Sequence, residues 1–184
     1  MEKNYNINRE IFTLSSLTNA PKTFMKFAQI SYFITDFLCN DYPKYLEWFC
    51  KKQIPGLFNG TREIVLYTID NKVAGVAFLK KDSTESKLCT LFIVEEYRRM
   101  HIATKILEYS FKYLGTTKPL ASINEFELPL FENIIKKYNW KLTQIKKKGY
   151  YNNFSREFVY NGKISWFPFK KIHSLILLNF RVYF

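Results

Sequence analysis

Residues 89–107 constrain the fold of this chain more than any other stretch. Residues 89–94 are a mostly apolar run of strand length, rich in β-branched and aromatic side chains. A polar turn follows, and apolar residues then recur on one side of a predicted helix at Ile102, Ala103, Ile106 and Leu107. A strand that leads directly into a helix leaves N–H groups without partners at the helix start, where the helix dipole favours an anion. Because Arg98 and Arg99 stand at that point, the stretch predicts a phosphate-binding turn.

The composition predicts a single packed domain. Of the 184 residues, 47% are hydrophobic and 18% aromatic, which is ample for a core and excludes a disordered chain. The formal net charge of +12 invites a nucleic-acid partner. The basic residues are, however, mixed with acidic ones through most of the chain, and the compact basic run is residues 146–148. We therefore attribute the charge to a lysine-rich coding bias, and note that a positive field suits an anionic cofactor; nucleic-acid binding stays the weaker hypothesis.

Cysteine and histidine usage narrows the chemistry. Cys39, Cys50 and Cys89 form no paired motif, so we expect buried, reduced thiols in a cytoplasmic protein. Two histidines are too few for metal sites that need several imidazoles, and we expect no metal. The N-terminus leads into no signal-peptide core, and the apolar run at residues 175–178 is too short to cross a bilayer. We therefore expect no transmembrane segment.

The remaining pattern alternates strands and helices. Strands are predicted at residues 10–17, 63–69, 72–80, 88–94, 118–123, 140–145 and 154–160. Helices are predicted at residues 22–39, from Asp41 and Pro43 to about residue 54, from 102 to Gly115, and from 127 or 128 to 138, with Leu130, Ile134 and Ile135 facing the core. Asp70 and Asn71 form a hairpin turn pair, Gly75 indicates a bulge or a close backbone approach, and Asn139 ends the last helix.

Residues 96–103, Glu-Tyr-Arg-Arg-Met-His-Ile-Ala, resemble a motif of the GNAT family of acyl-CoA-dependent N-acetyltransferases. The family carries Arg/Gln-x-x-Gly-x-Gly/Ala at a strand-to-helix junction, often preceded by Glu-Tyr. His101 departs from it, because the family has a glycine where the backbone approaches the cofactor pyrophosphate. Residues 131–140 resemble a second family segment, Phe-Tyr-x-Lys-x-Gly-Phe, with Lys137 kept and Asn139 in place of its glycine.

The resemblance implies an α+β fold in three layers, with a mostly antiparallel central sheet flanked by helices, the acyl-CoA N-acyltransferase fold. It is clearest over residues 63–160, within a domain of residues 1–162, and residues 163–184 form an apolar, basic extension. It also implies an N-acetyltransferase that uses acetyl-CoA as co-substrate and transfers the acetyl group directly to a primary amine in a ternary complex. The sequence does not identify the amine-bearing acceptor. Most aromatic residues of the first two helices are expected in the core, with some lining the acceptor cleft.

The implied cofactor contacts fall on residues 89–107. The backbone of a splayed strand is expected to pair with the pantetheine arm, and the turn and helix start to bind the pyrophosphate. The predicted cofactor-binding residues are Leu91, Phe92, Ile93, Arg98, Arg99, Met100, His101, Ile102, Ala103 and Thr104.

The candidate catalytic residues are Glu95, Asn124, Glu125 and Tyr138. Glu95 and Glu125 follow predicted strands and are candidates for the general base that deprotonates the amine. Asn124 is a candidate acceptor-side group, with a bond to the cofactor arm or a helix cap as alternatives. Many family members have a tyrosine that protonates the leaving thiolate, and the matching residue here, Ile135, has no proton to donate. Tyr138, one turn onward, is the candidate donor; the alternatives are a core or edge role for Tyr138 and proton donation by water.

Two other classes of function stay open. His101 and Ile135 also fit a GNAT-fold binding module that is impaired in catalysis. The positive charge fits a basic nucleic-acid-binding protein that uses exposed aromatic residues. For the extension, the alternatives are an additional strand or helix, a homodimer contact and a membrane-surface anchor.

Overall fold

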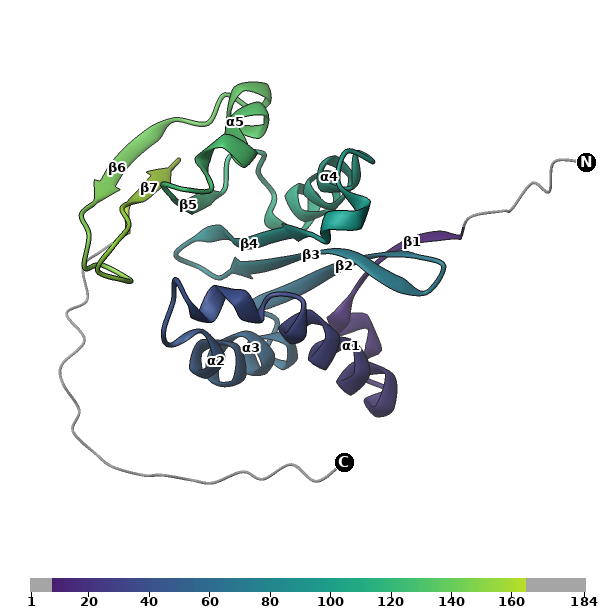
Figure 1. The fold of residues 1–184 in the computed structure, drawn as a ribbon. Coiled ribbons are helices and arrows are strands. Elements are labelled where there is room, and N and C mark those ends of the chain that lie inside the picture. The colour runs from purple at the N-terminus through teal and green to yellow at the C-terminus, as the bar shows by residue number, and fades with distance from the viewer. Residues whose placement is uncertain (1–7, 165–184) are drawn as a thin grey trace, which may run out of the picture.

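A computed structural model describes residues 8–164, which form a seven-stranded sheet flanked by helices (Figure 1). The strands are β1 (Arg9–Thr13), β2 (Arg62–Ile69), β3 (Lys72–Lys81), β4 (Ser86–Ile93), β5 (Leu120–Asn124), β6 (Leu142–Lys146) and β7 (Glu157–Tyr160). The α-helices are α1 (Pro21–Phe33), α2 (Tyr45–Trp48), α3 (Ile54–Phe58), α4 (Ile102–Leu114) and α5 (Leu128–Lys137). Four shorter helical segments are η1 (Leu14–Leu17), η2 (Asp36–Cys39), η3 (Phe49–Gln53) and η4 (Glu95–Tyr97).

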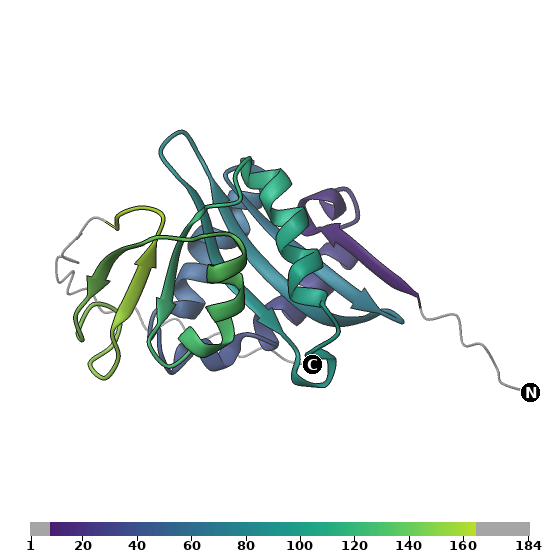
Figure 2. The same ribbon diagram turned by 90° about the horizontal axis from the view of Figure 1, so that it is seen from above.

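The strands lie in the order β1-β2-β3-β4-β5-β7-β6, and all neighbours are antiparallel except β4 and β5. Figure 1 shows α1, α2 and α3 on one face of the sheet and α4 and α5 on the other, and Figure 2 gives the view from above. One hydrophobic core joins the sheet to α4, and a second joins it to the α1–α3 layer. The predicted three-layer, mostly antiparallel α+β architecture is confirmed.

The strands β2, β3 and β4 form the predicted meander. Asp70 and Asn71 connect the first two with φ angles of 47° and 65°, the left-handed pair that a two-residue hairpin needs. Gly75 lies where β3 passes closest to its neighbours. A Cβ atom there would stand 2.7 Å from Cδ1 of Ile93 and 2.9 Å from Cδ1 of Ile106. The register of β2 and β3 also shifts just beside it, so both the predicted bulge and the close approach are present.

The N-terminal helical layer differs from the prediction of two long helices. The first ends at Phe33, because the buried Thr35 hydroxyl donates to the Ser31 carbonyl at 2.7 Å and bonds Tyr45 Oη at 2.6 Å. Such side-chain bonds compete with the helical ladder, and a separate short turn follows. The second helix continues beyond its predicted end, through a π-helical segment into α3, where Pro55 occupies the first turn.

Other segments also depart from the sequence-based expectation. The strand predicted at residues 10–17 ends at Thr13 and continues as η1. Trp140 precedes β6, and its indole N–H donates to the Thr117 carbonyl at 2.8 Å. Cys50 is exposed and the other two cysteines are half-buried, so the prediction of buried thiols is wrong, although all three are free. Across residues 8–164, no helix combines the length and apolar character that crossing a membrane requires.

A buried carboxylate on β2 yields a stability prediction. Glu63 is 4% exposed and accepts N–H groups from Ser15 at 3.1 Å and Ile64 at 2.9 Å. Burial raises the pKa of Glu63 above its ordinary 4.5, although the Ser15 hydroxyl, which also donates to it, opposes this shift. Folding therefore favours the protonated form. Its contribution to stability is complete below the ordinary pKa and is lost as pH rises through the raised one.

Replacement of Glu63 by Gln should remove this pH dependence while keeping the shape and most hydrogen bonds of the side chain. We expect the free energy of unfolding of E63Q to improve relative to the wild type as the pH rises above the ordinary pKa of 4.5 and through the raised one. Denaturant titrations of both proteins at several pH values measure the difference. A relative gain by the wild type over this interval would contradict the assignment.

Candidate active site

The candidate site begins where β4 and β5 part. Within the described chain these parallel strands pair at two positions, Lys87 with Leu120 and Leu88 with Ala121. β4 nevertheless continues to Ile93 and stays paired with β3 along its other edge. Beyond the second position, the edge of β4 that faces β5 therefore presents backbone N–H and C=O groups to a gap.

A bulge marks the point of divergence. Thr90 pairs with Phe78 of β3, and Leu88 pairs with Leu79, so Cys89 is an extra residue in β4. A bulge bends its strand and increases the local twist. The bulge lies immediately after the last residue paired with β5, at the point where the two strands part.

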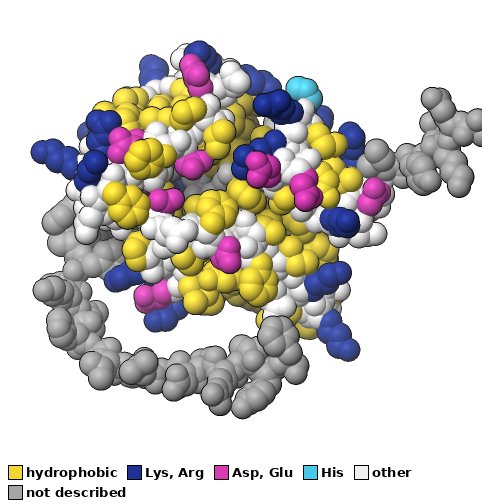
Figure 3. Space-filling model, viewed as in Figure 1, with side chains coloured by type: hydrophobic (Ala, Val, Ile, Leu, Met, Phe, Trp, Pro, Cys, Tyr) yellow, Lys and Arg dark blue, Asp and Glu magenta, His cyan; other side chains and the backbone are white. Residues whose placement is uncertain are grey.

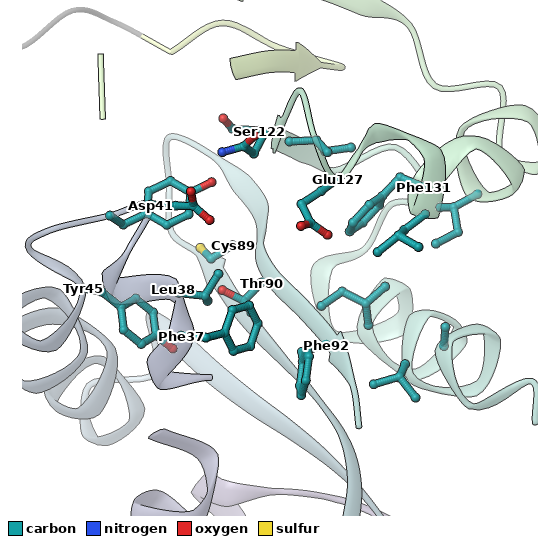
Figure 4. A pocket seen from close by; sticks show the side chains of 18 of the residues that line it. Phe37, Leu38, Asp41, Tyr45, Cys89, Thr90, Phe92, Ser122, Glu127 and Phe131 are labelled. Atoms are coloured by element: carbon teal, nitrogen blue, oxygen red, sulfur yellow. The ribbon is translucent and has the colours of Figure 1, made fainter. Parts of the chain in front are cut away.

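A cavity of about 1020 Å³ occupies the gap. Its walls come from both helical layers, so it passes through the sheet between the two strands. Figure 3 shows hydrophobic side chains, with acidic ones among them, around a hollow on this face. In Figure 4, Cys89, Thr90 and Phe92 lie along β4, between Phe37 on one side and Phe131 on the other. The volume is at the upper end of the range for small-molecule sites.

The start of α4 supplies a positively charged part of the wall. Arg98, Arg99 and His101 line the cavity, and no side chain caps the helix. Its first turn contains no acidic residue. The N–H groups of the first helical residues have no partner within the helix, and the dipole there favours an anion. The turn and helix start lie where the sequence predicted them, and phosphate binding there stays a prediction.

His101 adopts the backbone conformation that a glycine would have. Its φ angle is 58°, and that of Arg99 is 64°, both in the left-handed region. For most residues other than glycine, the left-handed conformation is about 1–2 kcal/mol less stable than the right-handed one. Histidine is found in the left-handed region more often than most residues. The His101 side chain is exposed at the cavity wall.

Eight of the ten predicted cofactor-binding residues line the cavity. They are Leu91, Phe92, Ile93, Arg98, Arg99, His101, Ile102 and Ala103. Met100 is 39% exposed and, like Thr104, lies outside the lining. The strand, turn and helix start therefore come together around one space.

Helix α5 supplies the facing wall. Glu127, Leu130, Phe131 and Ile134, spaced along one side of the helix, line the cavity. Figure 4 shows the Glu127 carboxylate directed into the cavity toward β4. Leu130 is 61% exposed, so the prediction that it faces the core is wrong, since its side of the helix lines an open cavity. Ile135 packs against the α4 core.

Three of the four candidate catalytic residues lie outside this lining. Glu95 is exposed. Glu125 accepts the backbone N–H of Arg156 at 2.8 Å and its Nε at 2.9 Å, and these bonds lower the pKa of the Glu125 carboxyl. The ring of Tyr138 packs edge-on against Phe111, with the centroids 4.8 Å apart. Glu125 thus forms an ion pair with Arg156, and Tyr138 packs against α4.

Asn124 does line the cavity, but other groups engage its side chain. Its Nδ2 donates to Ser155 Oγ at 2.9 Å, and its Oδ1 accepts the Phe126 N–H at 3.0 Å. The residue is 3% exposed. Its side chain thus holds the turn before α5, but it does not cap the helix, whose N-cap residue is Glu127.

A residue that the sequence analysis missed lies behind the cavity wall. Glu157 of β7 is 1% exposed and accepts the Tyr42 hydroxyl at 2.9 Å and the Ser122 hydroxyl. Both hydroxyls belong to residues that line the cavity. Burial raises the pKa of the Glu157 carboxyl above its ordinary value, against the opposing effect of the two hydroxyl bonds and of Lys87.

The sequence contained a signal for this residue. Glu157 precedes Val159 by two positions in a predicted strand, so the two share a face of the sheet. Val159 is fully buried. A carboxylate on the same face as a buried valine is itself expected to be buried, and a buried carboxylate needs hydrogen-bond partners. This expectation singles out Glu157 as a candidate for a special role.

A polar network holds the loop between β6 and β7 over the cavity. Asn152 donates to the Asp41 carbonyl at 2.9 Å and accepts the Ser155 N–H at 2.8 Å. The same loop carries Tyr150 and Tyr151, which line the cavity. The Tyr151 ring packs edge-on against Tyr42 at 5.2 Å between centroids. The loop and the segment before α2 thus form one wall.

Sequence comparisons find no matching family model and no matching curated protein. Solved structures do match. A Desulfovibrio desulfuricans protein, whose crystal structure was assigned to the GNAT family of acetyltransferases, superposes with a TM-score of 0.61 at 11% identity. The match covers 83% of this chain and 97% of that protein.

Two further matches are shorter. The ribosomal-protein-S18-alanine N-acetyltransferase of Escherichia coli has a TM-score of 0.47 at 14% identity, covering 58% of this chain and 76% of that one. Nourseothricin acetyltransferase has a TM-score of 0.49 at 8% identity, and the match spans 55% of this chain and 65% of that enzyme. On the evidence of the longer superposition, this chain has the fold of the GNAT acetyltransferases.

Proposed function

We propose that this protein is an N-acetyltransferase, which transfers the acetyl group of acetyl-CoA to a primary amine. The transfer is direct, within a ternary complex of enzyme, acetyl-CoA and acceptor. The observation that carries the proposal is the cavity between β4 and β5, which reaches the uncapped, positively charged start of α4. A cavity open to both helical layers has room for two substrates that meet between the strands.

The residues at α4 fit the anionic end of the cofactor. The N–H groups of Ile102 and Ala103 lie in the first helical turn, and Arg98 and Arg99 add positive charge beside them. Arginine suits phosphate because its N–H groups form charge-assisted, often bidentate, hydrogen bonds. The left-handed backbone at His101 supports this fit, since glycine adopts that conformation readily and His101 stands at the position of the family's glycine.

The free edge of β4 fits the pantetheine arm. Leu91, Phe92 and Ile93 line the cavity, and the strand edge there faces no partner strand among residues 8–164. Amide groups of an extended ligand pair with such an edge as a further strand would. A strand edge also supplies N–H donors that polarise a thioester carbonyl when it lies against them.

The leaving thiolate receives its proton from water in this proposal. Ile135 packs in the α4 core, and the α5 side chains beside the cavity are apolar except Glu127. A CoA thiol has a moderate pKa, so its thiolate leaves without a dedicated donor more readily than an amine does. Because the thiolate leaves readily, we expect attack by the acceptor amine, rather than departure of the thiolate, to limit the rate of transfer.

Binding of acetyl-CoA tests the proposed phosphate-binding part of the site, at the start of α4. We expect calorimetric titration of the purified protein to detect binding at sub-millimolar concentration, and R99A to weaken it about tenfold, since a charge-assisted hydrogen bond contributes about 1.5–3 kcal/mol. K112A is the matched control. Lys112 lies at the opposite end of the same helix, where its loss should leave the affinity unchanged. Absence of binding up to about 1 mM would overturn the proposal.

Replacement of His101 by Gly tests the departure from the family motif. We expect H101G to keep or tighten acetyl-CoA binding and to raise the free energy of unfolding by up to about 1 kcal/mol, because it relieves a left-handed histidine. G115A is the contrasting variant at the other end of α4. Gly115 has a φ of 74°, so alanine there should destabilise the protein. Loss of binding in H101G would show that the imidazole itself is a ligand.

Turnover separates an enzyme from a binding module. A panel of primary amines, incubated with acetyl-CoA and followed by release of free thiol, should contain at least one acceptor. Tight acetyl-CoA binding together with no release of thiol across the panel would favour the impaired binding module instead.

A further inference from the structure

The wall of the cavity opposite α4 combines aromatic rings with carboxylates. The aromatic residues there are Phe37, Tyr42, Tyr45, Trp48, Tyr150 and Tyr151. Asp41 and Glu127 line the same cavity, and Glu157 lies immediately behind two of its residues. Aromatic faces and carboxylates both attract a cation. Lys44 and Lys87 line the cavity as well, so the wall carries charges of both signs. Its rings and carboxylates supply the groups that a protonated amine needs.

Glu157 accepts two side-chain hydroxyls, each from a residue that lines the cavity. One of its oxygens accepts the Tyr42 hydroxyl at 2.9 Å, and the other accepts the Ser122 hydroxyl. Each hydroxyl directs its proton to the carboxylate, so each oxygen keeps lone pairs for another donor. The two residues come from different sides of the gap, Tyr42 from the segment before α2 and Ser122 from β5.

We propose that Glu157 draws the proton of the acceptor ammonium through the hydroxyls of Tyr42 and Ser122. This inference rests on the proposed acetyl transfer and adds to it the route of the proton and the class of acceptor. Glu157 is a positioning residue in this scheme, because it orients the two hydroxyls and acts through them. The acceptor is a cationic primary amine carried on an aromatic or aliphatic body, which the surrounding rings accommodate.

The proton transfer is balanced and needs no other reactant. The ammonium nitrogen gives a proton to one hydroxyl oxygen, and the proton already on that oxygen passes to the Glu157 carboxylate. The products are a neutral amine, an unchanged hydroxyl and a protonated carboxyl group. The neutral amine then has the lone pair that attacks a thioester carbonyl. Burial raises the pKa of Glu157, which brings its proton affinity closer to that of a base useful near neutral pH.

Charged and titratable groups surround Glu157 from each neighbouring segment. They are Asp41 and Tyr42 before α2, Lys87 on β4, and Tyr150 and Tyr151 on the β6–β7 loop. Lys87 stabilises the ionised carboxylate, while Asp41 destabilises it. Burial raises the pKa of both Tyr42 and Tyr151, so each phenol keeps its proton at neutral pH and Tyr42 remains a donor to Glu157.

The test measures thiol release from acetyl-CoA with 2-phenylethylamine as the acceptor, across a range of pH. We expect the wild-type kcat/KM to rise with pH on the acid side as Glu157 ionises. In E157Q we expect kcat to fall about 100-fold and this acid limb to disappear, because a positioned general base contributes roughly 10²–10⁴-fold. The affinity for acetyl-CoA, measured by calorimetry, should stay that of the wild type.

Further variants separate the proton route from simple loss of packing. Y42F and S122A should each lower kcat less than E157Q, and either change added to E157Q should cost little more, since the three groups act as a unit. E157D should restore part of the acid limb. E63Q is the matched control, because Glu63 is also buried with a raised pKa but does not line the cavity or bond to a residue that does. Its acid limb should remain.

Each other outcome counts against the inference. It is overturned if E157Q keeps the acid limb, if E127Q removes that limb instead, or if the wild type does not acetylate 2-phenylethylamine. In all three cases, continued binding of acetyl-CoA would leave the proposed cofactor site intact. Failure of acetyl-CoA to bind the wild type would instead refute the proposed function itself.

Discussion

The site depends on the short pairing between β4 and β5. A parallel neighbour normally occupies the edge of a strand along its whole length, and here that pairing stops after two positions, at the Cys89 bulge. β3 holds the other edge of β4 in place, so the strand diverges without losing its position in the sheet. The gap gives the cavity access to both helical layers and leaves backbone groups free inside a rigid sheet. With full pairing, α4 would still begin with its charged turn, but it would face a closed sheet.

Local sequence patterns predicted the parts of the fold that local physics controls. Asp70, Asn71 and Asn139 all adopt the positive φ angles that their positions in the pattern required. Gly75 is likewise packed too tightly for a side chain. The helix predicted across Thr35 failed, because the hydroxyl that ends it bonds to Tyr45, ten residues away and in another element. No periodicity in a single segment reveals such a bond.

The same division runs through the site. The half of the cavity at β4 and the start of α4, which is positively charged, lies on one continuous stretch. The sequence could therefore place most of those residues at the cavity. The opposite half is assembled from segments far apart in the chain, and Glu157 acquires meaning only beside Tyr42 and Ser122. Glu63 offers a contrast of position. Its donors are the Ser15 and Ile64 N–H groups and the Ser15 hydroxyl, and neither residue lines the cavity. Two carboxylates of similar burial are thus suited to different roles.

The bonds that join residues 41 and 42 to residues 152 and 157 have a consequence for biosynthesis. Tyr42 reaches Glu157 over 115 residues, and Asn152 reaches the Asp41 carbonyl over 111. A chain emerging from the ribosome can complete β2, β3, β4 and α4 well before these partners exist, because those elements are neighbours in sequence. The bonds of Tyr42 and Asp41 cannot form until residues 152–157 have been synthesised. Nascent chains therefore pass through a stage in which β4 and the start of α4 are formed. At that stage, Tyr42 and Asp41 still lack the partners that hold them.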